Sequence, residues 1–259
     1  MFCSNRAFAR EKPCTFIKCM EAAHKTARAL VRLGPAGQER ARLPVVRGAV
    51  GWDRDGDTLQ IGIGRLQAAA MSALTGHRDL GFHSGLISDE VLDLVEVGAL
   101  NGARKNRDPG LIVTGAVFGS QRLYDFVSDD SVRMHGVGYT HDVPTIASID
   151  NFVSINACMQ VDLYGQVMAD HINGRQISAP GGYNDFQRGA RLSDGGRSIV
   201  LMTAASADGS KSNIVAHMAE GGVITATRTD TDREKRRTDA RPPGRAAGQA
   251  GHPPHPRPP

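Results

Sequence analysis

Residues 57–76, "DTLQIGIGRLQAAAMSALTG", combine an apolar strand pattern, a glycine turn and an alanine-rich helical pattern in immediate succession. The run "DTLQIGIG" is expected to form a strand that ends in glycines. The run "LQAAAMSALTG" is expected to form a helix that Gly76 stops. A strand that continues through glycines into a helix is the repeating unit of an α/β sheet, so this stretch sets the expected fold class.

The next stretch places several polar groups between a turn and a helix. Glycines flank "GFHSG" at residues 81–85, which favours a turn, and "SDEVLDLVEVG" at 88–98 has helical periodicity. Ser88 is expected to cap the start of this helix, because its hydroxyl can accept a hydrogen bond from a backbone amide of the first turn. Gly98 is expected to end the helix. Two first-turn carboxylates complement the helix dipole. The expected buried stripe contains Val91, Leu94 and Val95.

The alternation of strand and helix patterns continues toward the C-terminus. Such alternation predicts an α/β fold with a largely parallel sheet and covering helices, whose ligands bind beyond the carboxyl ends of the strands. Turns such as "GIGR", "HSG" and "APGG" would lie at that edge. The remaining segments are strands at 111–118, 131–140, 197–205, 212–218 and 223–228, a helix at 120–129 and an extended or hairpin region at 152–167.

Composition supports the same class and narrows the partners. Of the 259 residues 40% are hydrophobic but only 5% aromatic, which suits an aliphatic α/β core. The basic residues behind the net charge of +4 gather at the two ends, and the middle of the chain is acidic, so nucleic acid is not expected as a partner. No apolar run is long enough to span a bilayer, and no membrane association is expected.

The ends of the chain are expected to differ from the central domain at 51–230. Residues 1–50 are expected to form an irregular arm with a short helix. Residues 231–259 are basic, rich in proline and poor in large apolar residues, so they are expected to be disordered. The cysteines lack the spacing of a zinc site or a disulfide framework, which indicates reduced thiols and a cytoplasmic location. They are Cys3, Cys14, Cys19 and Cys158.

Local motifs alone do not decide the chemistry. "GIGRLQ" has Gln67 where a dinucleotide-binding turn has its third glycine, and "GFHSG" is not a nucleophile elbow, because Ser84 stands one place late. His83, Ser84 and Asp89 could suggest a triad, but a helix start already explains the carboxylate, and the structural interpretation is favoured. The loop at 177–186, "ISAPGGYNDF", is either an ordinary turn or a site whose amides receive an oxyanion or phosphate.

Taken in order, these segments resemble the acetyl-CoA hydrolase/transferase family, which includes succinyl-CoA:acetate and 4-hydroxybutyrate CoA-transferases. The resemblance covers about residues 55–230 and implies a CoA-transferase-like α/β fold, which matches the alternation of elements. The segments that carry it are "DGDTLQIGIG", "LGFHSGLISDEVLDLVEVGALNGARK", "GSQRLYDF", "VSINACMQVDLYGQV", "GGYNDFQRGA" and "GGRSIVLM".

The resemblance implies acyl transfer between CoA and a carboxylic acid through a glutamate nucleophile. Attack of a carboxylate on the thioester gives a mixed anhydride, to which the released thiolate returns, leaving a glutamyl thioester of CoA. The substrates would be an acyl-CoA, such as acetyl-CoA in acetate metabolism, and a small carboxylate, with coenzyme A as a substrate and no other cofactor or metal.

The expected nucleophile is missing from this sequence. The family glutamate directly follows "H-T" or "H-S", and here that position is Gly85. Glu90 lies five residues further on at a helix start, where it would point elsewhere. Attack by water with His83 or Glu90 as base would turn transfer into hydrolysis.

Other family positions are retained. Gly62 and Gly64 match a turn that resembles a CoA-contacting loop, and Gly181 and Gly182 match a loop whose amides can serve the oxyanion near the thioester. Asn156 matches a segment, also containing Asp162, that is expected to shape the site, and Asn156 itself is expected to help bind CoA or the acyl group. At position 183 the chain has Tyr where a smaller polar residue is common, which would narrow the acyl pocket.

Two departures concern the whole chain. Residues 1–50 do not match the family's first half, which forms one wall of the cleft, and the tail replaces the family's C-terminal continuation. The chain is therefore expected to be a truncated copy whose reading frame changed near Thr231. Two hypotheses follow: an acyl-CoA hydrolase/transferase-type protein, or an inactive remnant or CoA-binding subunit. The second would pair as a homo-oligomer or with a chain that supplies the missing half.

Overall fold

The computed structural model describes residues 54–172, 174–206, 210–218 and 224–227. The arm expected at 1–50 and the tail expected at 231–259 lie outside the described residues, and the domain expected at 51–230 is described in most of its length.

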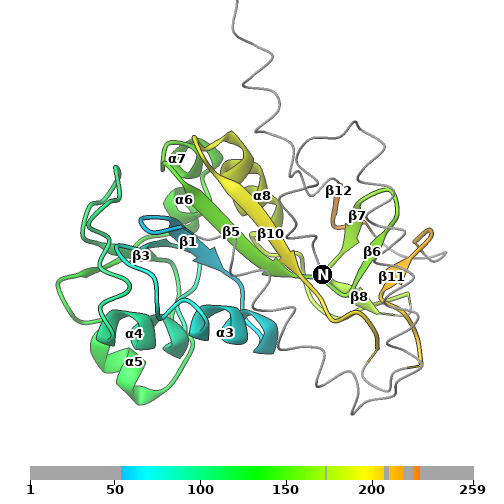
Figure 1. Ribbon diagram of the computed structural model, residues 1–259, viewed down its shortest axis with the longest axis horizontal. Helices are drawn as coiled ribbons and strands as arrows, with labels where there is room; N and C mark the ends of the chain where they lie inside the picture. Colours follow the sequence, from blue (N-terminus) through cyan, green and yellow to red (C-terminus); the bar gives the residue numbers. More distant parts are fainter. Residues whose placement is uncertain (1–53, 173, 207–209, 219–223, 228–259) are drawn as a thin grey trace, which may run out of the picture.

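A six-stranded sheet forms the centre of the described chain (Figure 1). Its strand order is β10-β5-β1-β2-β3-β4, and all of these neighbours pair in parallel, which confirms the predicted parallel sheet. The strands are β1 (Thr58–Ile61), β2 (Gly81–His83), β3 (Ile112–Thr114), β4 (Val132–Met134), β5 (Phe152–Ala157) and β10 (Arg197–Leu201).

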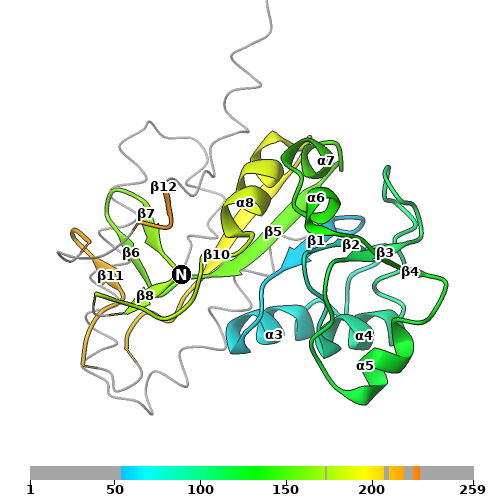
Figure 2. The ribbon, with the colours of Figure 1, turned by 180° about the vertical axis from the view of Figure 1, so that it is seen from behind.

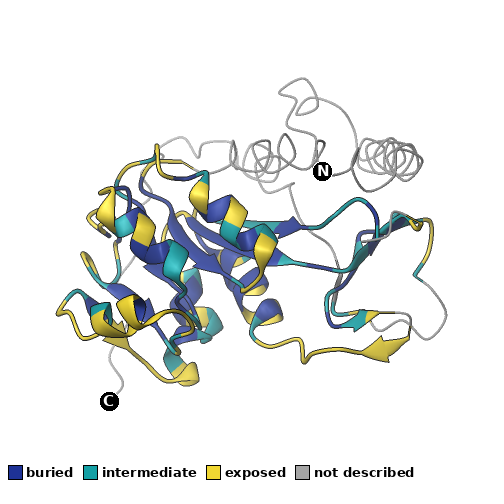
Figure 3. Cartoon of the chain, turned by 90° about the horizontal axis from the view of Figure 1, so that it is seen from below, coloured by how far each residue is buried: buried dark blue, intermediate teal, exposed yellow. Residues whose placement is uncertain are grey.

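Helices cover both faces of this sheet (Figures 1 and 2). On one face lie α3 (Arg65–Ser72), α4 (Asp89–Glu96) and α5 (Gln121–Phe126). On the other lie α6 (Val137–Thr140), α7 (Val143–Ala147) and α8 (Tyr183–Leu192). Figure 3 shows that these helices turn buried sides to the sheet and exposed sides to solvent.

Each face has its own apolar core. Leu59, Phe82 and Leu94 are fully buried on the side of α3 and α4, whereas Phe152 packs with Phe186 on the side of α8. Complete burial of side chains of this size contributes about 1.5–3 kcal/mol each. The two cores hold the sheet rigid between two helical layers, so the loops at its carboxyl edge start from fixed points.

Smaller sheets follow the carboxyl end of β5. A four-stranded sheet has the order β11-β6-β7-β12, and β8 pairs with β9 as a separate hairpin. The β6–β7 turn is shaped by the buried Asp162 carboxylate, which accepts from the amides of Tyr164 and Gln166 at 2.9 Å each. The elements are β6 (Gln160–Asp162), β7 (Gln166–Met168), β8 (His171–Ile172), β9 (Arg175–Gln176), β11 (Ile214–Val215) and β12 (Ala226–Thr227).

Some predicted boundaries were wrong. The strand expected at 131–140 ends at Met134, because α6 begins at Val137 after Gly136. The loop expected at 177–186 contains the start of α8, whose buried side includes Phe186 and Ala190, one helical turn apart. In α4, Ser88 is at the N-cap without a side-chain bond to the helix, and Val95 is only half-buried.

Candidate active site

The glycine turn after β1 lies where the strand order changes direction. β1 pairs with β2 on one side and with β5 on the other, and ligands of parallel sheets bind at such a switch point. Gly62 N donates to Ile155 O at 3.0 Å, which ties the turn to β5. Gly64 has φ +135°, a conformation that favours glycine, and caps α3. The turn therefore brings bare backbone to the edge of the sheet.

Asn156 holds this edge from the end of β5. Its Nδ2 donates to Gln60 Oε1 at 3.1 Å and to Ser154 Oγ at 2.9 Å, and its Oδ1 accepts from Gln60 Nε2 at 3.2 Å. A Cβ atom added to Gly62 would lie 3.2 Å from Asn156 Oδ1. These hydrogen bonds hold in place the side chains that lie next to the glycine turn. The expected binding role of Asn156 stays a prediction.

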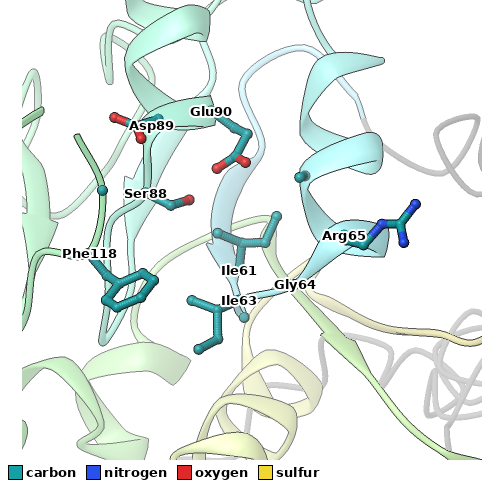
Figure 4. A pocket seen from close by; sticks show the side chains of 11 residues that line it. Ile61, Ile63, Gly64, Arg65, Ser88, Asp89, Glu90 and Phe118 are labelled. Atoms are coloured by element: carbon teal, nitrogen blue, oxygen red, sulfur yellow. The ribbon is translucent and has the colours of Figure 1, made fainter. Parts of the chain in front are cut away.

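A cavity of about 340 Å³ opens beside the turn, between the starts of α3 and α4. Figure 4 shows the Ser88 hydroxyl and the Glu90 carboxylate pointing into it, whereas Arg65 points away. Ile63 and Phe118, 59% and 65% exposed, supply apolar surface at its mouth. The cavity thus combines glycine backbone, apolar surface and a carboxylate.

Glu90 therefore lies with Gly62 and Gly64, all of which line this cavity. Glu90 was expected to point elsewhere than toward Gly85, and this placement does not contradict that expectation. The cavity lining does not include Gly85, so the structure does not bring Glu90 to the position of the family nucleophile. A role for Glu90 as a base stays a prediction.

Gly85 faces a histidine that the sequence did not single out. A Cβ atom at Gly85 would lie 2.4 Å from His141 Cε1, and one at Gly182 would lie 2.3 Å from His141 Cδ2. The imidazole of His141 therefore fills the space between the loop after β2 and the start of α8. No local motif marks His141, because its partners are distant in the sequence.

His83 is too enclosed for the role of a base. It is fully buried, and its Nε2 donates to Thr140 O at 3.1 Å, while Nδ1 has no hydrogen-bond partner in the described part of the chain. Burial, aided by the positive charge of Lys105, lowers the pKa of His83 to about 4. A neutral imidazole without solvent access acts as a packing residue at the end of β2.

The loop before α8 places Gly182 against the His141 ring, and Gly181 precedes it in the chain. Gly181 is exposed with φ +56°, and Gly182 is the N-cap of α8, whose first amides point toward the carboxyl edge. Tyr183 is buried in the apolar cluster of the smaller sheet. Burial raises the pKa of its hydroxyl above the usual range. Its expected effect on the acyl pocket stays a prediction.

The residues of the possible triad bond to other partners. Ser84 Oγ donates to Ile61 O at 3.2 Å, and the Asp89 carboxylate accepts from Ser120 N at 3.0 Å and from Ser120 Oγ at 2.8 Å. Within the described ranges no hydrogen bond links His83, Ser84 and Asp89. This supports the structural interpretation of the pattern.

The residues with a described placement contain neither a candidate metal site nor a helix that could span a membrane. No group of three or more His, Cys, Asp or Glu could hold a metal ion there. The helices in that part of the chain are too short or too polar to cross a bilayer.

Comparison with known proteins identifies the family. Residues 119–233 match the model of the acetyl-CoA hydrolase/transferase C-terminal domain. The 4-hydroxybutyrate coenzyme A transferase of Clostridium kluyveri is 41% identical over 179 residues, which are 69% of this chain and 42% of that protein. The butyryl-CoA:acetate CoA-transferase of Anaerostipes caccae is 38% identical over 68% of this chain and 41% of its own length.

Solved structures agree with this relationship. The 4-hydroxybutyrate CoA-transferase of Porphyromonas gingivalis superposes with a TM-score of 0.62 at 36% identity, over 70% of this chain and 43% of that one. RipA of Yersinia pestis gives a TM-score of 0.67 at 34% identity, over 72% of this chain and 42% of its own. The chain thus spans less than half the length of these relatives. By sequence and by fold, it belongs to the acetyl-CoA hydrolase/transferase family.

Proposed function

We propose that this chain acts on acyl-CoA thioesters, moving CoA from an acyl-CoA such as acetyl-CoA to a carboxylic acid or to water. The observation that carries the proposal is the glycine turn at Gly62–Gly64, which lies at the switch point of the sheet in a chain of this family. Relatives named as CoA-transferases for 4-hydroxybutyrate and butyrate support the substrate class.

The proposed binding site is the carboxyl edge of the six-stranded sheet. Backbone amides at the Gly62–Gly64 turn approach the ligand closely because no side chain intervenes. The amides that begin α8 at Gly182 are aimed to stabilise the oxyanion of a tetrahedral intermediate. CoA is a substrate in this scheme, and no further cofactor is proposed.

Transfer by double displacement needs a carboxylate beside the thioester, and Gly85 provides none. This supports two arrangements within the proposed function. In one, the chain itself breaks the thioester with water. In the other, it is a CoA-binding subunit that a second copy, or a chain supplying the N-terminal half, completes for transfer. Turnover by the purified chain alone distinguishes the first arrangement from the second.

A cytoplasmic location is part of the proposal. The one described cysteine, Cys158, is buried, and burial raises the pKa of its thiol to about 12, so it stays protonated and unreactive. A reduced thiol of this kind fits a reducing compartment.

Calorimetric titration of CoA and acetyl-CoA into the natural chain, Gly62→Val and Gly76→Val tests the binding site. Val at Gly62 would crowd Asn156 and the turn, whereas a Cβ atom at Gly76 meets nothing within 4 Å. The natural chain and Gly76→Val are expected to bind equally, and Gly62→Val about tenfold or more weakly, which is about 1.4 kcal/mol. Absence of binding by the natural chain, or equal binding by all three, contradicts the proposal.

A further inference from the structure

The imidazole of His141 occupies the place that the missing nucleophile would need. Its Nε2 lies 2.7 Å from the Cβ position of Gly85 and 2.5 Å from the Cβ position of Gly182. A side chain at Gly85 would require the ring of His141 to move. The glycine at position 85 therefore permits the observed position of His141 at the carboxyl edge.

Contacts on its other side hold the ring in this orientation. Thr140 Oγ1 lies 2.8 Å from Nδ1, and the ring packs against Phe186 of α8 with a centroid distance of 4.7 Å. Thr140 Oγ1 also donates to Gly136 O at 3.4 Å. We assign the tautomer in which the Thr140 hydroxyl donates to Gly136 O and accepts a hydrogen bond from His141 Nδ1–H. This tautomer leaves the lone pair on Nε2, the nitrogen that faces the two glycines.

The surroundings keep this imidazole neutral. Burial lowers the pKa of His141, and the opposing attraction of Asp185 is the smaller effect. Among the described residues no hydrogen bond occupies Nε2. His141 is half-buried, in contrast to the fully buried His83, so water can reach it.

We propose that His141 is a catalytic base of this chain and directs its chemistry toward hydrolysis of the acyl-CoA thioester. The proposal rests on the proposed function, because it requires an acyl-CoA at the carboxyl edge. Nε2 takes a proton from water as the water oxygen bonds to the thioester carbonyl carbon. The C–S bond then breaks, and the thiolate of CoA takes the proton from Nε2. The products are free CoA and a carboxylic acid, which ionises.

Other titratable groups are less well placed for this role. Glu90 lines the cavity beside the β1 turn, which does not include Gly85. His135, although exposed, packs in a tilted arrangement on Tyr139 with a centroid distance of 4.4 Å, and its atoms are not among those nearest to the Cβ positions of Gly85 and Gly182. It offers a matched control for a substitution at His141.

The test compares the natural full chain, His141→Gln and His135→Gln in two assays: calorimetric binding of CoA, and release of thiol from acetyl-CoA. We expect the natural chain and His135→Gln to hydrolyse acetyl-CoA equally. His141→Gln should bind CoA within about twofold of the natural affinity and hydrolyse at least about 100-fold more slowly, the usual contribution of a general base.

A third variant distinguishes the loss of the catalytic base from a change in the shape of the site. His141→Ala leaves a gap the size of the ring between Gly85 and Gly182, and added imidazole should restore part of the hydrolysis in this variant but not in His141→Gln. Binding of CoA without hydrolysis by the natural chain, or natural rates in His141→Gln, overturns the role of His141 and leaves the proposed function standing. Absence of CoA binding by the natural chain contradicts both.

Discussion

The loops after β1 and β2 lie next to each other at the carboxyl edge of the same sheet, yet they differ in what they retain. The β1 loop has Gly62, Gly64 and a neighbouring network around Asn156, which the sequence resemblance matches to the family. The β2 loop has the buried His83 and Ser84 but Gly85 where the resemblance implies a glutamate nucleophile, with His141 lying against it. The residues expected to bind CoA and the residue expected to react with it therefore lie in two different loops at the same edge of the sheet.

This difference shows which features of the edge belong to the scaffold. His83, Ser84 and Lys105 bond to backbone carbonyls around the end of β2. These bonds hold the loop in place whatever residue stands at position 85. We therefore expect a substitution at position 85 to change the chemistry of the β2 loop more than its backbone.

Restoring the nucleophile should give the largest effect. Gly85→Glu alone places its Cβ atom against His141, so we expect little CoA transfer from it. Gly85→Glu with His141→Ala removes the obstacle and should raise transfer from acetyl-CoA to a carboxylate at least about 100-fold over the natural chain, since loss of a covalent nucleophile typically costs more. The assay follows acyl-CoA exchange by chromatography.

His141→Ala alone is the control for this pair, and it should show no transfer. Equal transfer by Gly85→Glu and the double variant would mean that His141 does not compete for this space. If neither variant transfers CoA although both still bind it, the missing carboxylate at position 85 does not explain the absence of transfer.

Lys105→Met should reduce stability by about 3 kcal/mol. The buried Lys105 Nζ donates to Phe82 O at 3.1 Å and to Leu111 O at 2.7 Å, and methionine leaves both carbonyls without this donor. Arg188→Met on the exposed side of α8 is the matched control, expected within about 0.5 kcal/mol of the natural chain. Urea unfolding measures both, and equal midpoints would show that the β2 loop does not depend on Lys105.

Stability should fall as the pH falls from 7 to 5, and His83 should cause much of this change. Its folded pKa of about 4 is below the ordinary value of 6.5, so the unfolded chain binds the proton more readily. The contribution of His83 to the free energy of unfolding is fully present above pH 6.5 and is lost as the pH falls toward 4. At pH 5 the loss is about 2 kcal/mol. In urea unfolding at both pH values, His83→Phe should show a smaller difference; an unchanged difference would assign the effect to other groups.

The smallest effect is expected at the helix that follows His141. Asp142 Oδ2 accepts from Thr145 N at 2.8 Å and caps α7, so Asp142→Ala should cost about 1 kcal/mol. Asp142→Asn keeps an acceptor and should lose less. Thermal unfolding distinguishes the two, and a stability of Asp142→Ala equal to that of the natural chain would show that the cap is not needed to place His141.

The sequence predicted the parts of the fold that depend on local patterns. The alternation of apolar strands and helices from Asp57 onward indicated the parallel sheet, and the glycines after β1 indicated its carboxyl edge. The start of α8 was missed, because Pro180 and two glycines suggested a loop while the buried side of the helix begins only at Tyr183.

The contents of the site were harder to predict than its position. That Gly85 stands at the position of the family nucleophile stays a prediction from the sequence. His141 was not identified, because its role depends on contacts with Gly85 and Gly182, which only the packing of α6 and α8 brings together. The direction of Glu90 into the cavity beside the β1 turn was not predicted, because it depends on how α4 packs beside α3.

One mass measurement tests most directly whether this chain has kept the CoA site and lost the carboxylate nucleophile. The natural chain is incubated with acetyl-CoA, and its mass is measured by mass spectrometry, first under native and then under denaturing conditions. The account predicts a mass increase of one CoA species under native conditions and the mass of the chain alone after denaturation. An adduct that survives denaturation would show that another carboxylate acts as nucleophile, and no adduct under either condition would show that the edge does not bind CoA.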